Sequence, residues 1–213
     1  MTTARETGVI RNEIDVGRMG QAKKNPVRIL LLWGDLYGAN CTMGGKKLSI
    51  LDKFRGYSWD LTSAGVEKTV APCAFAAQRG QSTIDLDCAV SEIDDVTAYD
   101  GISVLPGPRF DGLIESPDAL RLVRRASEGG LVVSGWCRGV RVLAAADVIR
   151  GKRVVCHADD RGFIEAAGGI YVGHDHPPVT DGLLVTGARS YYYRTKNAEA
   201  IRTAIVHRAS PDE

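Results

Sequence analysis

The sequence has no surplus of either charge and no long apolar run. Its 27 Lys and Arg residues balance 26 Asp and Glu residues, which leaves a formal net charge of +1 at pH 7. A balanced chain creates no global field that would attract a polyanion, so we expect no nucleic-acid partner. No apolar segment approaches the roughly 20 residues that a membrane helix requires, so we expect no membrane partner.

The cysteines are few and show no paired motif in their spacing. The 213 residues include five cysteines, an odd number without a CxxC motif. These are Cys41, Cys73, Cys88, Cys137 and Cys156. This pattern argues against both a disulfide framework and a zinc ribbon, and it favours a reducing, cytoplasmic location. His174, Asp175 and His176 resemble a metal-ligand cluster, but their Gly- and Pro-rich surroundings favour a solvated loop, so we predict no metal site.

The length suits one domain that buries its own core. Residues 1–25 are polar and lack the apolar stretch of a secretory signal, so we interpret them as a flexible leader or an arm on a partner subunit. Residues 26–208 are expected to form the domain and residues 209–213 a short tail.

Apolar runs alternate with helical patterns along the chain. We expect strands at 27–33, 58–65, 99–105, 131–135, 151–157, 170–172 and 179–186, and helices at 43–54, 117–128, 140–146, 160–167 and 197–207. The periodicity is poor from 66 to 96. This alternation predicts an α/β three-layer sandwich whose mostly parallel sheet has helices on both faces.

Between the run 131–133 and the following helical pattern, the chain reads Gly135-Trp136-Cys137-Arg138-Gly139. This is the cysteine version of a nucleophile elbow, a tight strand-to-helix turn at the carboxyl edge of the sheet. Backbone N–H groups and the helix dipole there favour a thiolate, which predicts a reactive Cys137. The alternative is a buried cysteine at a tight junction.

Four landmarks occur in a recognisable order. They are strand 27–33 with its loop, the segment 99–107 (Tyr-Asp-Gly-Ile-Ser-Val-Leu-Pro-Gly), the elbow with its Leu-Ala-Ala-Ala helix, and 179–186 (Val-Thr-Asp-Gly-Leu-Leu-Val-Thr). Over residues 27–208 the sequence resembles the ThiJ/PfpI superfamily, within the class I glutamine-amidotransferase-like folds. The resemblance implies a homodimer whose elbow cysteine works without a cofactor or metal.

The resemblance also assigns roles around Cys137. His157 stands where some members carry an imidazole, which acts as general base or steadies the thiolate as imidazolium. The alternative is a loop histidine whose ring is satisfied by the backbone. Cys156, its neighbour, is a candidate resolving thiol.

Three positions depart from the family pattern. Asn40 occupies the place of a carboxylate that no amide can replace as a proton acceptor, and Asp35 is a substitute only if the loop folds differently. Arg138 replaces a histidine and can hold an anion or lower the pKa of Cys137, but it cannot act as a base. Pro108 removes an oxyanion N–H that Pro-Gly-Gly members supply.

Other residues can complete the site. The Arg138 amide remains as an oxyanion donor, Gly107 in the strand-end loop is a further oxyanion or substrate-binding candidate, and Arg109 or Asn40 can replace the lost donor. Trp33 and Trp136 either wall an apolar pocket or pack in the core. Tyr191–Arg194 either line a pocket or bury a dimer contact.

We therefore expect a cofactor-independent enzyme in which Cys137 acts on a small electrophilic metabolite by hydratase, glyoxalase-like or hydrolase chemistry. Its altered surroundings indicate a specialised substrate, as in secondary metabolism. The alternatives are a non-catalytic redox or ligand sensor that uses the same cysteine, and a purely structural subunit that pairs with an active homologue. Glutaminase activity is not expected.

Overall fold

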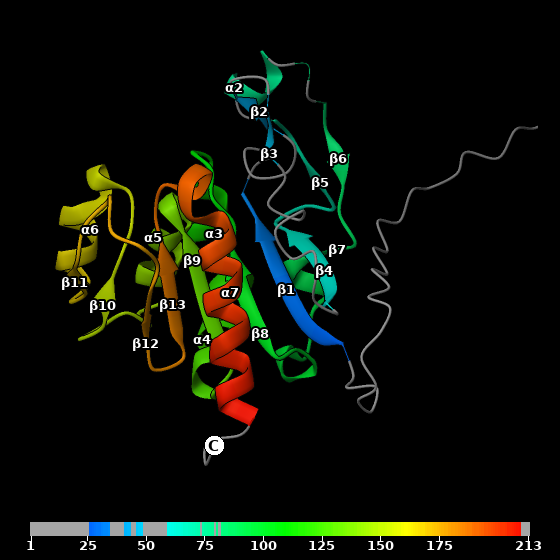
Figure 1. Ribbon diagram of the computed structural model, residues 1–213. Coiled ribbons are helices and arrows are strands. Elements are labelled where there is room, and N and C mark those ends of the chain that lie inside the picture. The colour runs from blue at the N-terminus through cyan, green and yellow to red at the C-terminus, as the bar shows by residue number, and fades with distance from the viewer. Residues whose placement is uncertain are drawn as a thin grey trace, which may run out of the picture.

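A seven-stranded sheet forms the centre of the protein (Figure 1). The computed structural model describes residues 26–34, 41–43, 46–48, 59–72, 74–78, 80 and 82–209. The strand order is β12-β13-β9-β8-β1-β4-β7. The strands are β1 (Val27–Trp33), β4 (Trp59–Gly65), β7 (Cys88–Ala89), β8 (Gly101–Val104), β9 (Val132–Trp136), β12 (Val179–Asp181) and β13 (Leu184–Gly187). All neighbours pair in parallel except β12 and β13, which confirms the mostly parallel sheet.

Helices cover both faces of this sheet. On one face lie α3 (Asp111–Glu115), α4 (Pro117–Glu128) and α5 (Val140–Ala145), and on the other lies α7 (Ser190–Ala209) (Figure 1). In β1, Leu30 and Leu32 pack with the first group, whereas Ile29 and Leu31 pack with α7, because successive side chains of a strand point to opposite faces. The predicted three-layer α/β sandwich is confirmed.

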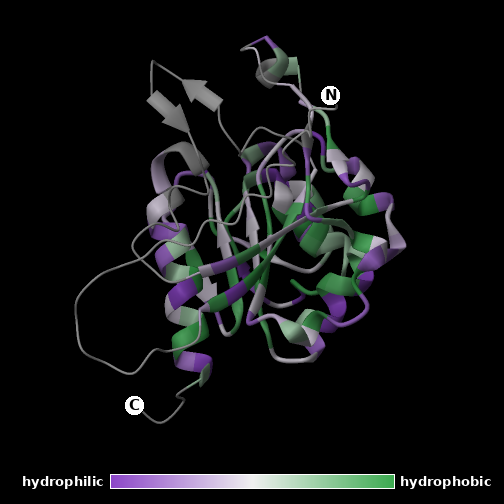
Figure 2. Ribbon diagram, turned by 90° about the vertical axis from the view of Figure 1, so that its right-hand side faces the viewer, coloured by the Kyte–Doolittle hydropathy of each residue, from purple (hydrophilic) through white to green (hydrophobic). Residues whose placement is uncertain are grey.

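Doubly covered strands explain the continuous apolar runs. Figure 2 shows hydrophobic segments in the centre of the molecule and hydrophilic positions on the outer turns of the helices. Residues 29–33 are all buried, as expected for a parallel strand with helices on each side. The helix predicted at 117–128 is confirmed at both ends. Ser116 Oγ accepts a hydrogen bond from the Ala119 N–H at 3.2 Å, Pro117 begins the helix, and Gly129 ends it.

The remaining elements are small. They are the antiparallel pairs β2 (Cys41–Met43) with β3 (Lys46–Leu48) and β5 (Thr69–Val70) with β6 (Ile84–Asp85), the parallel pair β10 (Arg153–Val154) with β11 (Ile170–Tyr171), helices α2 (Ala74–Ala77) and α6 (Arg161–Ala166), and 3-10 turns at Val90–Glu92, Val96–Ala98, Cys137–Gly139 and Ala158–Asp160.

Three sequence-based expectations differ from the structure. The helix predicted at 43–54 is wrong for Met43, the end of β2, and for residues 46–48, which form β3. The pair Gly44-Gly45 disfavours a helix there, and residues 49–58 lie outside the described part. The strand predicted at 151–157 shortens to β10 and pairs only with β11, because β13 occupies the sheet position beside β9. Helix α7 begins at Ser190 rather than at 197.

The predicted leader 1–25 and residues 210–213 lie outside the described residues, and Ala209, assigned to the tail, is the last residue of α7. None of the helices within the described ranges is long and apolar enough to cross a membrane.

Candidate functional site

The turn after β9 has the backbone geometry of a nucleophile elbow. Cys137 has a φ of 53°, which lies in the left-handed region that residues other than glycine rarely adopt. This backbone conformation costs about 1–3 kcal/mol. A Cβ added at Gly135 would lie 2.8 Å from Leu143 Cδ1, and one added at Gly139 would lie 2.8 Å from the Leu105 carbonyl oxygen. The two glycines therefore let strand, helix and β8 meet closely around the cysteine, and the predicted elbow is confirmed.

The Cys137 thiol keeps its proton at neutral pH. Burial is the largest effect and raises its pKa to about 11, helped by the negative charges of Asp160 and Asp159. The backbone N–H and the guanidinium of Arg138 act in the opposite direction and lower the pKa, but they do not offset burial. The raised pKa does not support the predicted thiolate at neutral pH, because burial of the sulfur outweighs the Arg138 N–H and guanidinium.

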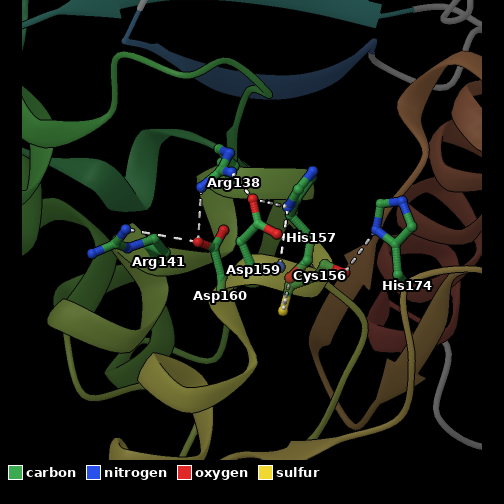
Figure 3. Close-up of polar contacts among 7 residues, drawn as sticks. All are labelled: Arg138, Arg141, Cys156, His157, Asp159, Asp160 and His174. Carbon is green, nitrogen blue, oxygen red and sulfur yellow. Dashed lines mark hydrogen bonds and ion pairs between the residues drawn. The ribbon is translucent and has the colours of Figure 1, made fainter.

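Arg138 binds carboxylates of the same chain. Its Nη2 donates to Asp159 Oδ2 at 2.6 Å, and its Nη1 donates to Asp160 Oδ1 at 3.0 Å (Figure 3). Asp160 is 1% exposed and also faces Arg141 Nη1 at 3.7 Å. Its Oδ2 is buried without a hydrogen-bond partner among the described residues. Arg138 thus ties the elbow to the turn at 158–160, instead of presenting an open guanidinium for an anion.

The sequence-based reasoning missed Asp159 and Asp160. The available signal was the pair of adjacent carboxylates directly after His157, with an arginine in place of the family histidine at 138. An arginine that enters a partly buried site needs a counter-charge, which consecutive aspartates can supply.

His157 is satisfied by the backbone. The Asp159 N–H donates to His157 Nδ1 at 3.2 Å, so the neutral ring carries its hydrogen on Nε2 and its open side is a donor. Burial, followed by the charge of Arg138, lowers the pKa of His157, which keeps the ring neutral at pH 7. Within the described part of the chain, no hydrogen bond joins this ring to the Cys137 sulfur. The backbone contact is the alternative of a loop histidine satisfied by the backbone, and Asp159 Oδ2 lies 3.5 Å from the same Nδ1. The roles of general base and imidazolium stay predictions.

Cys156 and His174 lie beside His157. The Cys156 thiol is fully buried and donates to the His157 carbonyl oxygen at 3.4 Å, and burial raises its pKa to about 12. A buried protonated thiol is a poor nucleophile, which argues against a resolving role. His174 Nδ1 lies 3.4 Å from the Cys156 carbonyl oxygen, and its ring meets the His157 ring edge-on at 5.0 Å between centroids (Figure 3).

The other predicted residues divide between the core and the strand ends. Asn40 and Asp35 lie outside the described residues. Trp33 and Trp136 are 2% and 1% exposed and pack with α7, which is the core-packing alternative. A Cβ at Gly34 would collide with the Arg109 carbonyl oxygen, so the segment after Gly107 lies against the end of β1.

The loop after β11 is held by the start of α7 and by Arg189, the residue before it. Asp175 forms an ion pair with Arg189, and its carbonyl accepts a hydrogen bond from the Tyr193 hydroxyl at 3.1 Å. Tyr192 is exposed and stacks beneath the Arg189 guanidinium. No group of side chains in the described residues could hold a metal ion.

A cavity of about 430 Å³ lies away from the elbow. It is lined by Thr180, Gly182, Leu183, Thr203, Ala204, His207 and Arg208. These residues lie around the β12–β13 hairpin and the end of α7, at the amino end of β13, whereas Cys137 follows the carboxyl end of β9. The cavity is therefore not part of the cysteine site.

Comparison with known proteins agrees with the fold. The model of the DJ-1/PfpI family matches residues 48–199. Protein DJ-1 homolog D of Arabidopsis thaliana is 33% identical over 106 residues, which are 48% of this chain and 27% of that protein. The match thus spans about a quarter of the length of that relative.

Two crystal structures illustrate the likeness. A two-domain protein of Anabaena variabilis, with DJ-1/ThiJ/PfpI-like and ferritin-like domains, aligns with a TM-score of 0.69 and 19% identity over 84% of this chain and 48% of that one. A cysteine-to-alanine mutant of a DJ-1 superfamily protein from Salmonella typhimurium aligns with a TM-score of 0.64 and 21% identity over 88% of this chain and 94% of that one. At these identities the likeness shows the fold.

Proposed function

Because this chain belongs to the DJ-1/PfpI family, we propose that it is a cofactor-independent enzyme in which Cys137 adds to a small electrophilic metabolite. The observation that carries the proposal is the left-handed backbone of Cys137 between two glycines that admit no side chain. Strain of this kind persists only where the surroundings impose it, and it is concentrated at functional sites.

The Cys137 thiol can add to a polarised double bond once its proton leaves the sulfur, because the thiolate is the nucleophile. With an aldehyde, the sulfur–carbon bond forms, the carbon–oxygen π bond breaks, and the thiol proton ends on the oxygen, which gives a hemithioacetal. Hydratase and glyoxalase-like reactions can both begin in this way. Hydrolysis is less well supported, because Pro108 has no N–H to donate to an oxyanion.

The charges beside the elbow favour a neutral substrate. Arg138 and Arg141 are matched by Asp159 and Asp160, so this cluster offers no net charge to an ion. On its open side His157 is a hydrogen-bond donor, which suits the oxygen of the electrophile.

Replacement of the nucleophile tests the proposal. We expect Cys137→Ala to abolish consumption of every neutral aldehyde, isonitrile or quinone that the wild type converts, whereas Cys88→Ala, at another half-buried cysteine, retains it. Unchanged turnover in Cys137→Ala would exclude nucleophilic catalysis at this position.

The sensor alternative makes the same demand on the thiol, because peroxide, like an electrophilic carbon, reacts with the thiolate. The raised pKa of Cys137, about 11, slows both reactions, so it does not separate the enzyme from the redox sensor. Mass spectrometry after mild peroxide treatment compares the oxidation of Cys137 with that of Cys88. The proposal includes a cytoplasmic homodimer. Light scattering of the purified protein measures its mass and so tests the dimer.

A further inference from the structure

The cavity at the amino end of β13 has no part in the cysteine chemistry. It lies between the β12–β13 hairpin and the last turn of α7 (Figure 1), and its volume of about 430 Å³ is in the range of pockets that hold small organic molecules. Its lining is mainly apolar, because Ala204 belongs to the core between the sheet and α7 and Leu183 packs against that core. A ligand in this cavity would therefore bury apolar groups.

Positive charge from two separate segments meets at this apolar surface. His207 and Arg208 line the cavity from the last turn of α7, and neither has a hydrogen-bond or ion-pair partner in the part of the chain that the structure describes. Lys152, just before β10, reaches the hairpin side, because a Cβ added at Gly182 would lie 3.6 Å from its Nζ. Basic residues at the end of a helix interact favourably with the helix dipole, but that reason does not apply to Lys152.

The carboxylate of Asp181 beside the cavity is already engaged. Its Oδ1 lies 3.4 Å from Lys152 Nζ, and its Oδ2 accepts a hydrogen bond from the Arg153 N–H at 2.9 Å. One carboxylate thus balances one ammonium group, and the guanidinium of Arg208 is left without a counter-charge among the described residues. Thr180 and Thr203 add hydroxyl donors to the lining.

We propose that this cavity binds a small organic anion, a monocarboxylate with an apolar chain or ring. The apolar part lies against Leu183 and Ala204, and the carboxylate accepts hydrogen bonds from the Arg208 guanidinium, whose planar fork matches its two oxygens. A neutral molecule would leave the positive charge unused, and an inorganic anion would leave the apolar surface exposed. The ion pairs beside the elbow are balanced, so the two sites select different ligands.

The test uses hexanoate as the probe and follows the backbone amides of the full-length protein by NMR. We expect saturable shifts at Gly182, Leu183 and Thr203, which line the cavity, and none at Cys137, at the opposite edge of the sheet. 1-Hexanol has the same chain without the charge. It should bind at least about tenfold more weakly, because a hydrogen bond between charged groups is stronger than one to a hydroxyl.

Three variants separate the charge from the shape of the cavity. Arg208→Gln should weaken hexanoate binding about tenfold and leave 1-hexanol binding unchanged. Thr203→Phe places a ring in the cavity from an exposed position and should abolish binding of both probes. Lys196→Gln is the matched control, because it removes one positive charge from an exposed position of α7 that does not line the cavity, so it should bind hexanoate like the wild type.

Four results would overturn the proposal: no saturable shifts, equal affinity for hexanoate and 1-hexanol, equal losses in Arg208→Gln and Lys196→Gln, or undiminished binding in Thr203→Phe. Shifts at the cavity amides that follow protein concentration instead of hexanoate would also overturn it, because a second copy of the chain would then cover the cavity. All of these results are independent of the proposed function, whose failure appears as undiminished turnover in Cys137→Ala.

Discussion

The reactivity of Cys137 should increase steeply far into the alkaline range. Its pKa rises from the ordinary value of 9.0 to about 11, which corresponds to about 3 kcal/mol of differential stabilisation of the neutral thiol. At pH 8 roughly one thiol in a thousand is ionised, against roughly one in ten for an unperturbed cysteine. We therefore expect iodoacetamide to alkylate Cys137 about a hundredfold more slowly than a cysteine peptide at pH 8.

Two substitutions next to Cys137 should shift its pKa in opposite directions, which tests the electrostatic argument. Asp159 raises the pKa of Cys137, so Asp159→Asn should lower it and speed alkylation. The Arg138 guanidinium lowers the pKa, so Arg138→Gln should raise it and slow alkylation. Mass spectrometry of the Cys137 peptide between pH 8 and about 11 gives the midpoint of each profile. A wild-type midpoint at or below 9.0, or a shift in the same direction for both variants, would refute the reasoning.

Two stability predictions test the contacts around the elbow. Gly139→Ala should lower the free energy of unfolding by about 1–3 kcal/mol in urea titrations, because its Cβ would press on the carbonyl oxygens of Leu105 and Val104. Gly162→Ala in α6, where the new Cβ would meet open space, should leave this free energy unchanged. Equal losses in the two variants would contradict the packing argument. Asp160→Asn should cost about 3 kcal/mol because it leaves Arg138 and Arg141 without their buried counter-charge, whereas the exposed Asp159→Asn should cost less than about 1 kcal/mol. A loss at Asp160 no larger than that at Asp159 would show that this pair does not hold the elbow.

Local patterns in the sequence were sufficient to predict the main strands and helices and the elbow at Cys137. The apolar run of β1 predicted a doubly covered strand, the Ser116-Pro117 start and Gly129 end predicted α4, and the glycines around Cys137 predicted the elbow. These features depend on neighbours in the chain, through side-chain periodicity, capping and backbone freedom. The sequence cannot show which strand lies beside which, so it did not predict that β10 pairs only with β11 while β13 lies beside β9.

The chemistry of the site depended on the tertiary structure. A helix start alone predicts a thiolate, but the packing around Cys137 removes water and reverses the direction of its pKa shift. The contacts of Arg138, His157 and His174 are made with partners that are distant in sequence or reached through a backbone atom, such as Asp160 and the Cys156 carbonyl. Residue type sets what a side chain can do, whereas burial and hydrogen-bond partners, which only the folded chain provides, decide which of its nitrogens, oxygens or sulfurs is free to do it.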